Sequence, residues 1–293
     1  MMNYVSKIAP LASATVLLIA APALMQAQQG GRGAGRGPAG PPPTGKSQAP
    51  FDPTGYWVSE IVDEWRFRVS PIKGDILYMP LNAEARRIAN AWDPAKDEAE
   101  GNQCKAYGAV GLMQRPGRLH ITWVDDNTLK VDADAGTQSR TWHFGPPPGA
   151  IPQPNAQGLP PDSVVAPSQR AGQPVGSPSL QGYSVAKWEG PGFGGGGRGF
   201  GQRPAGPPKT GTLNISTTNL LPGYLRKNGV PYSDKAALTE YVNLVDGQQG
   251  DIYIAVTAMV DDPVYLTGPF VRTYQFKKIP DATGWDPTPC WTK

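Results

Sequence analysis

Four charged residues lie in predicted β-strands, on the strand face whose other side chains are apolar. They are Asp63, Arg140, Glu240 and Arg272, and large apolar side chains lie two or four positions away from each of them. A charge that a strand turns into a protein interior is costly unless it is paired or meets a ligand. Arg272 is followed two positions later by Tyr274 on the same face. An arginine beside a tyrosine can hold the carboxylate of an apolar acid, because the guanidinium fork binds a carboxylate through two hydrogen bonds.

The same residues allow three other interpretations. Glu240 is a candidate general base if burial raises its pKa. The charges can also form a fixed internal ion pair, or face water if the strand register is shifted by one residue, which reverses every side chain. If these side chains do face the protein interior, the candidate ligand-binding residues are Arg272, Tyr274, Glu240, Arg140 and Trp65.

Motifs for metals, nucleophiles and phosphates are missing from the sequence. The two histidines, His120 and His143, fall on the polar sides of their predicted strands, and no metal-ligand spacing such as Cys-x-x-Cys or Glu-x-x-His occurs. There is no Gly-x-Ser-x-Gly motif. The glycine tract at 194–197 lacks the Lys-Ser/Thr of a phosphate loop. We therefore expect no metal and no cofactor.

The first residues and the cysteines indicate export. Residues 1–27 combine Lys7, an apolar run and small residues before a cleavage point, as in a secretory signal peptide. No second apolar stretch of that length follows, so we expect no integral membrane segment after signal removal. Cys104 and Cys290 are the only cysteines, and a single pair in an oxidising compartment usually forms a disulfide; two free thiols are the alternative. The predicted location is periplasmic or secreted.

Glycine and proline separate the chain into structured and unstructured parts. The chain holds 36 Gly and 33 Pro in 293 residues, and more than half of them lie in three segments, 28–50, 145–178 and 190–211. Segments of that composition cannot bury a core, so we expect a disordered linker and two flexible insertions. With 27 basic and 24 acidic residues the charge is nearly balanced, and the few Gly-Arg repeats do not indicate a nucleic-acid partner.

The remaining sequence, 51–293, is mostly β. Period-two alternation predicts a long strand or hairpin over residues 55–69, and a helix is expected over 81–92 with Asn82 as its cap. Further strands are predicted at 118–124, 128–134, 138–144, 182–189, 212–217, 238–244, 251–260 and 270–278. About nine or ten strands with one or two short helices predict a single closed antiparallel barrel, because closure removes sheet edges; a sandwich is the second possibility.

Several short motifs carry a resemblance to a known group. Gly55-Tyr56-Trp57 resembles the opening of lipocalins and related calycin barrels, in which the Trp closes one end of the barrel. The segments 93–99, 101–104, 228–233, 238–241 and 261–263, together with Pro269-Phe270, look like a group of secreted bacterial proteins described as lipocalin-like. The resemblance spans most of 51–290 and implies a calycin-like barrel and export. It implies no catalytic residues.

These observations predict an exported barrel that binds a small apolar or amphipathic, possibly acidic, ligand in an internal cavity. Two alternatives stay open. One is an isomerase or hydratase on the same barrel with Glu240 as its base. The other is a cell-envelope interaction module that acts through its Gly/Pro-rich segments, with a protein partner that the sequence does not identify.

Overall fold

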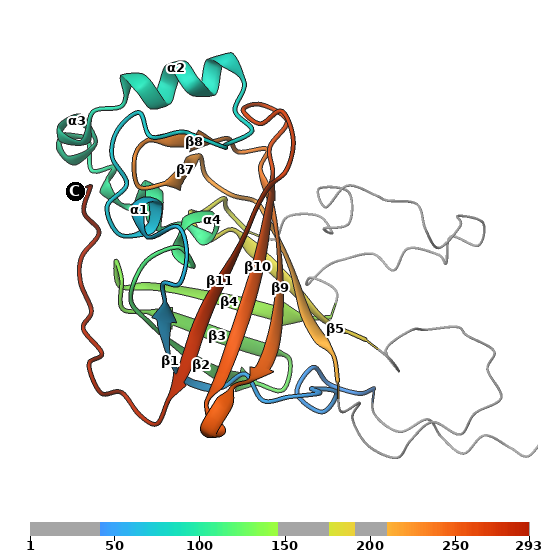
Figure 1. Cartoon of the computed structure of the whole chain (residues 1–293). Coiled ribbons are helices and arrows are strands. Elements are labelled where there is room, and N and C mark those ends of the chain that lie inside the picture. Colours follow the sequence, from blue (N-terminus) through green and yellow to red (C-terminus); the bar gives the residue numbers. More distant parts are fainter. Residues whose placement is uncertain (1–41, 146–175, 191–209, 293) are drawn as a thin grey trace, which may run out of the picture. The chain divides into compact units, whose positions relative to one another are not determined.

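The computed structural model describes residues 42–145, 176–190 and 210–292, and residues 43–293 group as one compact unit. Within the described residues, nine strands close into a barrel in the order β1-β11-β10-β9-β6-β5-β4-β3-β2, and a separate two-stranded sheet joins β7 to β8 (Figure 1). The strands are β1 Gly55–Glu60, β2 Arg118–Asp125, β3 Thr128–Ala133, β4 Gln138–Phe144, β5 Tyr183–Glu189, β6 Thr212–Thr218, β7 Gly223–Arg226, β8 Val230–Tyr232, β9 Ala237–Asp246, β10 Ile252–Asp261 and β11 Phe270–Ile279.

The barrel is mixed, so the predicted all-antiparallel arrangement is wrong. β4 and β5 run parallel, with Trp142 opposite Ser184 and Phe144 opposite Ala186, whereas every other pair in the barrel is antiparallel. A parallel neighbour requires a connection of a dozen or more residues, and residues 145–182 supply it. The Pro-rich insertion thus gives β5 the chain length it needs to enter the barrel in the direction of β4.

The predicted long strand or hairpin over residues 55–69 is confirmed only over its first six residues and is wrong beyond them. β1 ends at Glu60, and α1 then forms over Trp65–Arg68 after Glu64, whose φ of 50° lies in the left-handed region. The turn changes which side chains face inward: Arg68 is 2% exposed, while Trp65 is 67% exposed. Alternation across so few residues does not distinguish a strand from a bend followed by one helical turn.

Helices are more numerous than the one or two predicted. The described residues form α1 Trp65–Arg68, α2 Ala83–Ala91, α3 Pro94–Ala99, α4 Ala109–Leu112 and two 3-10 turns, η1 Gln103–Tyr107 and η2 Gln248–Gly250. The predicted helix over 81–92 is confirmed as α2, and the Asn82 side chain accepts a hydrogen bond from the Ala85 amide at 2.9 Å. Most of these helices and the β7–β8 sheet gather at one end of the barrel (Figure 1).

The core lies inside the barrel. Inward-facing side chains from its strands are buried and pack together, among them Trp57, Leu129, Trp142, Ile215 and Phe276, each at most 1% exposed. Trp57 also donates from its ring nitrogen to the Pro53 carbonyl at 3.0 Å. Among the described residues, no helix has the length and apolar character needed to cross a membrane.

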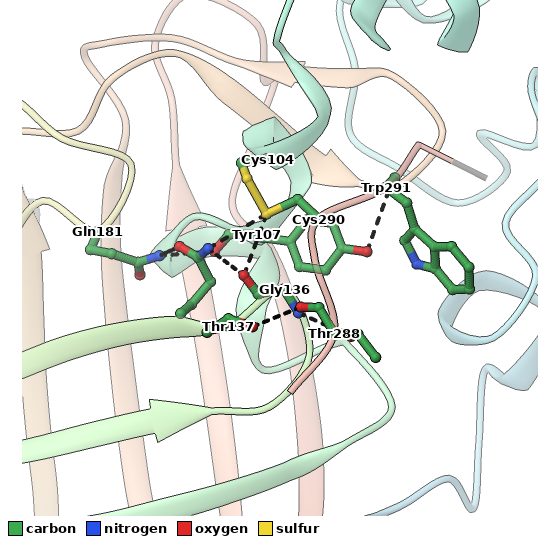
Figure 2. The surroundings of a disulfide bond; sticks show 9 residues. Cys104, Tyr107, Gly136, Thr137, Gln181, Thr288, Cys290 and Trp291 are labelled. Atoms are coloured by element: carbon green, nitrogen blue, oxygen red, sulfur yellow. Dashed lines mark hydrogen bonds between the residues drawn. A yellow bond between two sulfur atoms is a disulfide. The ribbon is translucent and has the colours of Figure 1, made fainter. Parts of the chain in front are cut away.

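The predicted disulfide is confirmed. Cys104, in η1, bonds to Cys290 near the end of the chain, with Cα atoms 5.1 Å apart (Figure 2). Beside it, the Thr137 hydroxyl donates to the Thr288 carbonyl at 2.9 Å, and the Thr288 amide donates to the Asp134 carbonyl at 3.0 Å. The bridge and these bonds hold the segment 281–292, called here the C-terminal strap, against the barrel.

Several predicted segments lie outside the described residues. They are the signal peptide 1–27, most of the linker 28–50 and most of the insertions 145–178 and 190–211. The last part of the predicted linker is different, because residues 43–50 belong to the barrel unit. The Trp188 ring nitrogen donates to the Gly45 carbonyl at 2.7 Å, and the Gly45 amide donates to the Asn127 side chain at 2.8 Å.

Candidate functional site: an arginine cluster at one end of the barrel

Four arginines from four separate segments meet at the end of the barrel that carries the helices. Arg68 ends α1, Arg115 follows α4, Arg226 ends β7 and Arg272 lies on β11. Arg68, Arg115 and Arg226 are at most 5% exposed, and the Arg272 side chain is 24% exposed. We call these four residues the arginine cluster. Tyr274 lies among them, 2% exposed, and interacts electrostatically with all four.

The guanidinium groups of the cluster are only partly hydrogen-bonded. Arg68 donates from Nε to the Gln114 carbonyl and from Nη1 to the Glu60 carbonyl, both at 3.3 Å. Its Nη2 has no hydrogen-bond partner among the described residues, and neither do Nε and Nη2 of Arg115 or Nη1 and Nη2 of Arg226. Native proteins pair nearly all buried polar groups, so this concentration of unpaired donors is unusual.

Few carboxylates balance this charge. Glu64 lies 2.8 Å from Nε of Arg272, without hydrogen-bond alignment, and 3.7 Å from Nη2 of Arg226. Asp63, whose side chain is 57% exposed, lies 4.0 Å from Nη1 of Arg68. Four arginines against these two acids leave a surplus of two positive charges; a third carboxylate, Asp75, also acts electrostatically on Arg226 but forms an ion pair with a further arginine, Arg66.

Burial and mutual repulsion weaken the proton affinity of the arginines. The pKa of Arg115 is lowered to about 10, chiefly by burial; the charges of Arg68 and Arg226 act in the same direction, and two tyrosines oppose them. Burial also lowers the pKa of Arg68 and of Arg226. The cluster therefore holds its charge at neutral pH at an electrostatic cost, which an anion placed among the guanidinium groups relieves.

Aromatic and apolar side chains surround the cluster. The Arg226 guanidinium lies 4.0 Å from the ring centre of Phe67, and the guanidinium of Arg272 lies 4.7 Å from that of Phe270. The segment 62–78, which contains Arg68, exposes six large apolar side chains, namely Val62, Trp65, Val69, Ile72, Leu77 and Tyr78. Exposed apolar groups concentrated in one short segment are typical of a binding surface.

The remaining predicted site residues are placed differently. Arg140 and Glu240 form an ion pair in the barrel interior, with contacts of 3.1 Å and 2.7 Å and both side chains 1% exposed. Arg140 also donates to the hydroxyls of Ser184 and Thr217 at 3.2 Å and 3.0 Å. This is the fixed internal pair that the sequence left as one alternative. Both carboxylate oxygens of Glu240 are engaged by Arg140, so the geometry does not present Glu240 as a base to a substrate.

The structure thus brings two of the predicted residues, Arg272 and Tyr274, to the arginine cluster. Trp65 lies outside the barrel on α1 and belongs to the exposed apolar segment. Sequence reasoning missed the other three arginines. Arg68 stood on the polar side of the predicted strand, while Arg115 and Arg226 lie in short segments with no periodicity that places them inside.

The two histidines lie on the outer face of the barrel, half-buried. His120 stacks on Tyr56 with ring centres 4.0 Å apart, and His143 stacks on Tyr183 at 5.0 Å. In the part of the chain that the structure describes, no three His, Cys, Asp or Glu residues are grouped as a metal site.

Comparison of the chain with models of protein families, with curated proteins and with solved structures gives no match.

Proposed function

We propose that this protein is an exported, calycin-like barrel that binds a small amphipathic acid at the arginine cluster. The observation that carries the proposal is the set of buried guanidinium N–H groups without partners on Arg68, Arg115 and Arg226. A carboxylate accepts two parallel hydrogen bonds from one guanidinium and has further lone pairs for a second arginine. Such an anion neutralises part of the charge surplus and satisfies several of the unpaired donors at once.

The apolar surroundings support an acid with a hydrocarbon part. Phe67 and Phe270 line the cluster, and the exposed apolar segment 62–78 begins beside it. The ligand then lies at the end of the barrel, with its acidic group inward, since the barrel interior is occupied by core side chains. The disulfide supports an oxidising location, so we place the protein in the periplasm or outside the cell.

Thermal unfolding in the presence of decanoate and decanol tests this function. We expect decanoate to raise the melting temperature with a concentration dependence that yields Kd, because a ligand that binds only the folded state stabilises it by mass action. Decanol shares the chain and lacks the charge, so its effect should be much smaller. Equal stabilisation by both compounds shows that the arginines do not recognise the ligand.

A matched pair of variants locates the site. Arg115→Met removes a buried guanidinium of the cluster, and Arg87→Met makes the same change at an exposed arginine on α2 that pairs with Glu84. Loss of a charged hydrogen-bond donor costs about 1.5–3 kcal/mol, so decanoate should bind Arg115→Met roughly 10- to 100-fold more weakly. Arg87→Met should bind normally. Unchanged affinity in Arg115→Met contradicts the proposed site.

A further inference from the structure

A second place on the molecule has the form of a ligand site, on the outer wall of the barrel and independent of the arginine cluster. A cleft of about 320 Å³ opens there. Its lining residues are Tyr56, His120, Asp132, Ala133, Thr137, Gln138, Ser139, Trp285 and Pro287. That volume is at the lower end of the roughly 300–1,000 Å³ of small-molecule sites.

The floor of the cleft is one row of side chains across four neighbouring strands. In the strand registers, Tyr56 of β1 is opposite His120 of β2, His120 is opposite Asp132 of β3, and Asp132 is opposite Ser139 of β4. Residues opposite one another on neighbouring strands share a face of the sheet. The row therefore presents a phenol ring, an imidazole ring, a carboxylate and a hydroxyl side by side on the rigid barrel wall.

The C-terminal strap supplies the other wall. In Figure 1 the chain leaves β11 and returns along the barrel towards α3. Trp285 on this strap meets Tyr56 edge to face, with ring centres 6.0 Å apart, and lies 6.4 Å from the ring of His120. The strap is fixed on both sides of the cleft, by Arg118 Nε donating to the Thr283 carbonyl and by Thr288 with Cys290 (Figure 2).

The charges around the cleft nearly cancel. Asp132 is paired with Lys130 at 2.9 Å, and Arg118 lies 3.9 Å from the buried Asp134. Neither a strong anion nor a strong cation is favoured by this balance. The chemistry that remains is aromatic surface together with a carboxylate, a hydroxyl and an imidazole, which can accept and donate hydrogen bonds.

We infer that the cleft binds a neutral sugar ring. A pyranose has faces of C–H groups that pack on aromatic rings, and a rim of hydroxyls that both donate and accept hydrogen bonds. Trp285 and the Tyr56–His120 pair provide the aromatic surface, while Asp132 and Ser139 provide acceptors and donors for the rim. The barrel then has two ligand sites of different chemistry, an acid at its end and a saccharide on its wall.

Saturation-transfer NMR with the full disulfide-bonded protein tests this site. The probes are cellobiose and the methyl glycosides of glucose, galactose and N-acetylglucosamine. Each is added up to 20 mM, because a site of this size is expected to bind a sugar with a millimolar Kd, about 4 kcal/mol of binding free energy. We expect transfer to the ring protons of at least one probe. Transfer to none of the four overturns the inference, and so does stronger binding of tetramethylammonium or benzoate at the same cleft.

Two tryptophans of the strap give a matched comparison. Trp285 lines the cleft, whereas Trp291 is exposed on the same strap and does not line it. Trp285→Ala should weaken sugar binding about five- to tenfold through loss of the ring contact, with Trp291→Ala unchanged. Equal affinity of the two variants contradicts the site. Arg115→Met, which tests the proposed acid site, should bind sugars normally, so the two proposals fail independently.

Discussion

Two regions of the part of the chain that the structure describes bury arginines, and they differ in how fully they pair them. In the barrel interior, Arg140 meets one carboxylate, Glu240, and two hydroxyls, and only its Nε has no partner among the described residues. At the barrel end, three buried arginines share few carboxylates and keep five nitrogens of Arg68, Arg115 and Arg226 unpaired.

The difference separates a buried charge that is paired within the fold from buried charges that have too few partners. A buried cation with a dedicated partner is complete in the folded protein, so removing the partner is what harms it. A group of buried cations without enough partners raises the energy of the folded state, and is useful where an incoming anion removes that cost. The interior pair is therefore complete within the fold, whereas the arginine cluster supports the proposed binding of an anion.

The largest effect is expected at the interior pair. Glu240→Gln leaves the Arg140 guanidinium buried without a counter-charge, and breaking a buried pair in this way costs about 3–5 kcal/mol of unfolding free energy. Urea denaturation followed by tryptophan fluorescence measures the loss. The double variant Arg140→Met/Glu240→Leu removes both charges and should recover most of the stability. A single variant as stable as the original protein shows that the pair is not electrostatically coupled.

A smaller effect of opposite sign is expected at the barrel end. Arg115→Met replaces an unpaired buried charge by an apolar chain of similar length, and such replacements are neutral or stabilising by about 1 kcal/mol or more. In a buffer free of organic acids, this variant should unfold at the same or a higher urea concentration than the original protein. A destabilisation as large as that of Glu240→Gln means that Arg115 is structurally paired, and the contrast between the two regions then disappears.

The smallest effect on stability is expected at Trp65. The side chain is 67% exposed, and substitutions of exposed residues usually change stability by less than about 0.5 kcal/mol. Trp65→Ser should therefore unfold normally and yet bind decanoate more weakly, as it removes apolar surface beside the cluster. Acetate has no hydrocarbon chain that could contact Trp65, so it should bind Trp65→Ser and the original protein equally. A large loss of stability shows that Trp65 is packed rather than available to a ligand.

The sequence determined the parts of this protein that depend on local pattern. Period-two alternation located eight of the nine barrel strands to within a few residues of their ends and the start of β1, and Asn82 marked the start of α2, because these signals act between neighbours in the chain. The sequence also placed Arg140, Glu240 and Tyr274 on inward faces. The disulfide followed from having a single pair of cysteines.

Only the tertiary structure decided the mixed strand pairing of the barrel and the composition of the arginine cluster. The parallel pairing of β4 with β5 depends on how a long connection returns the chain, which no local pattern records. Arg68, Arg115 and Arg226 come from segments far apart in the sequence, and each lies in a turn, a single helical turn or a short strand without usable periodicity. Their proximity is set by the packing of those segments on the barrel end, where burial of three guanidinium groups with few partners favours the proposed anion site.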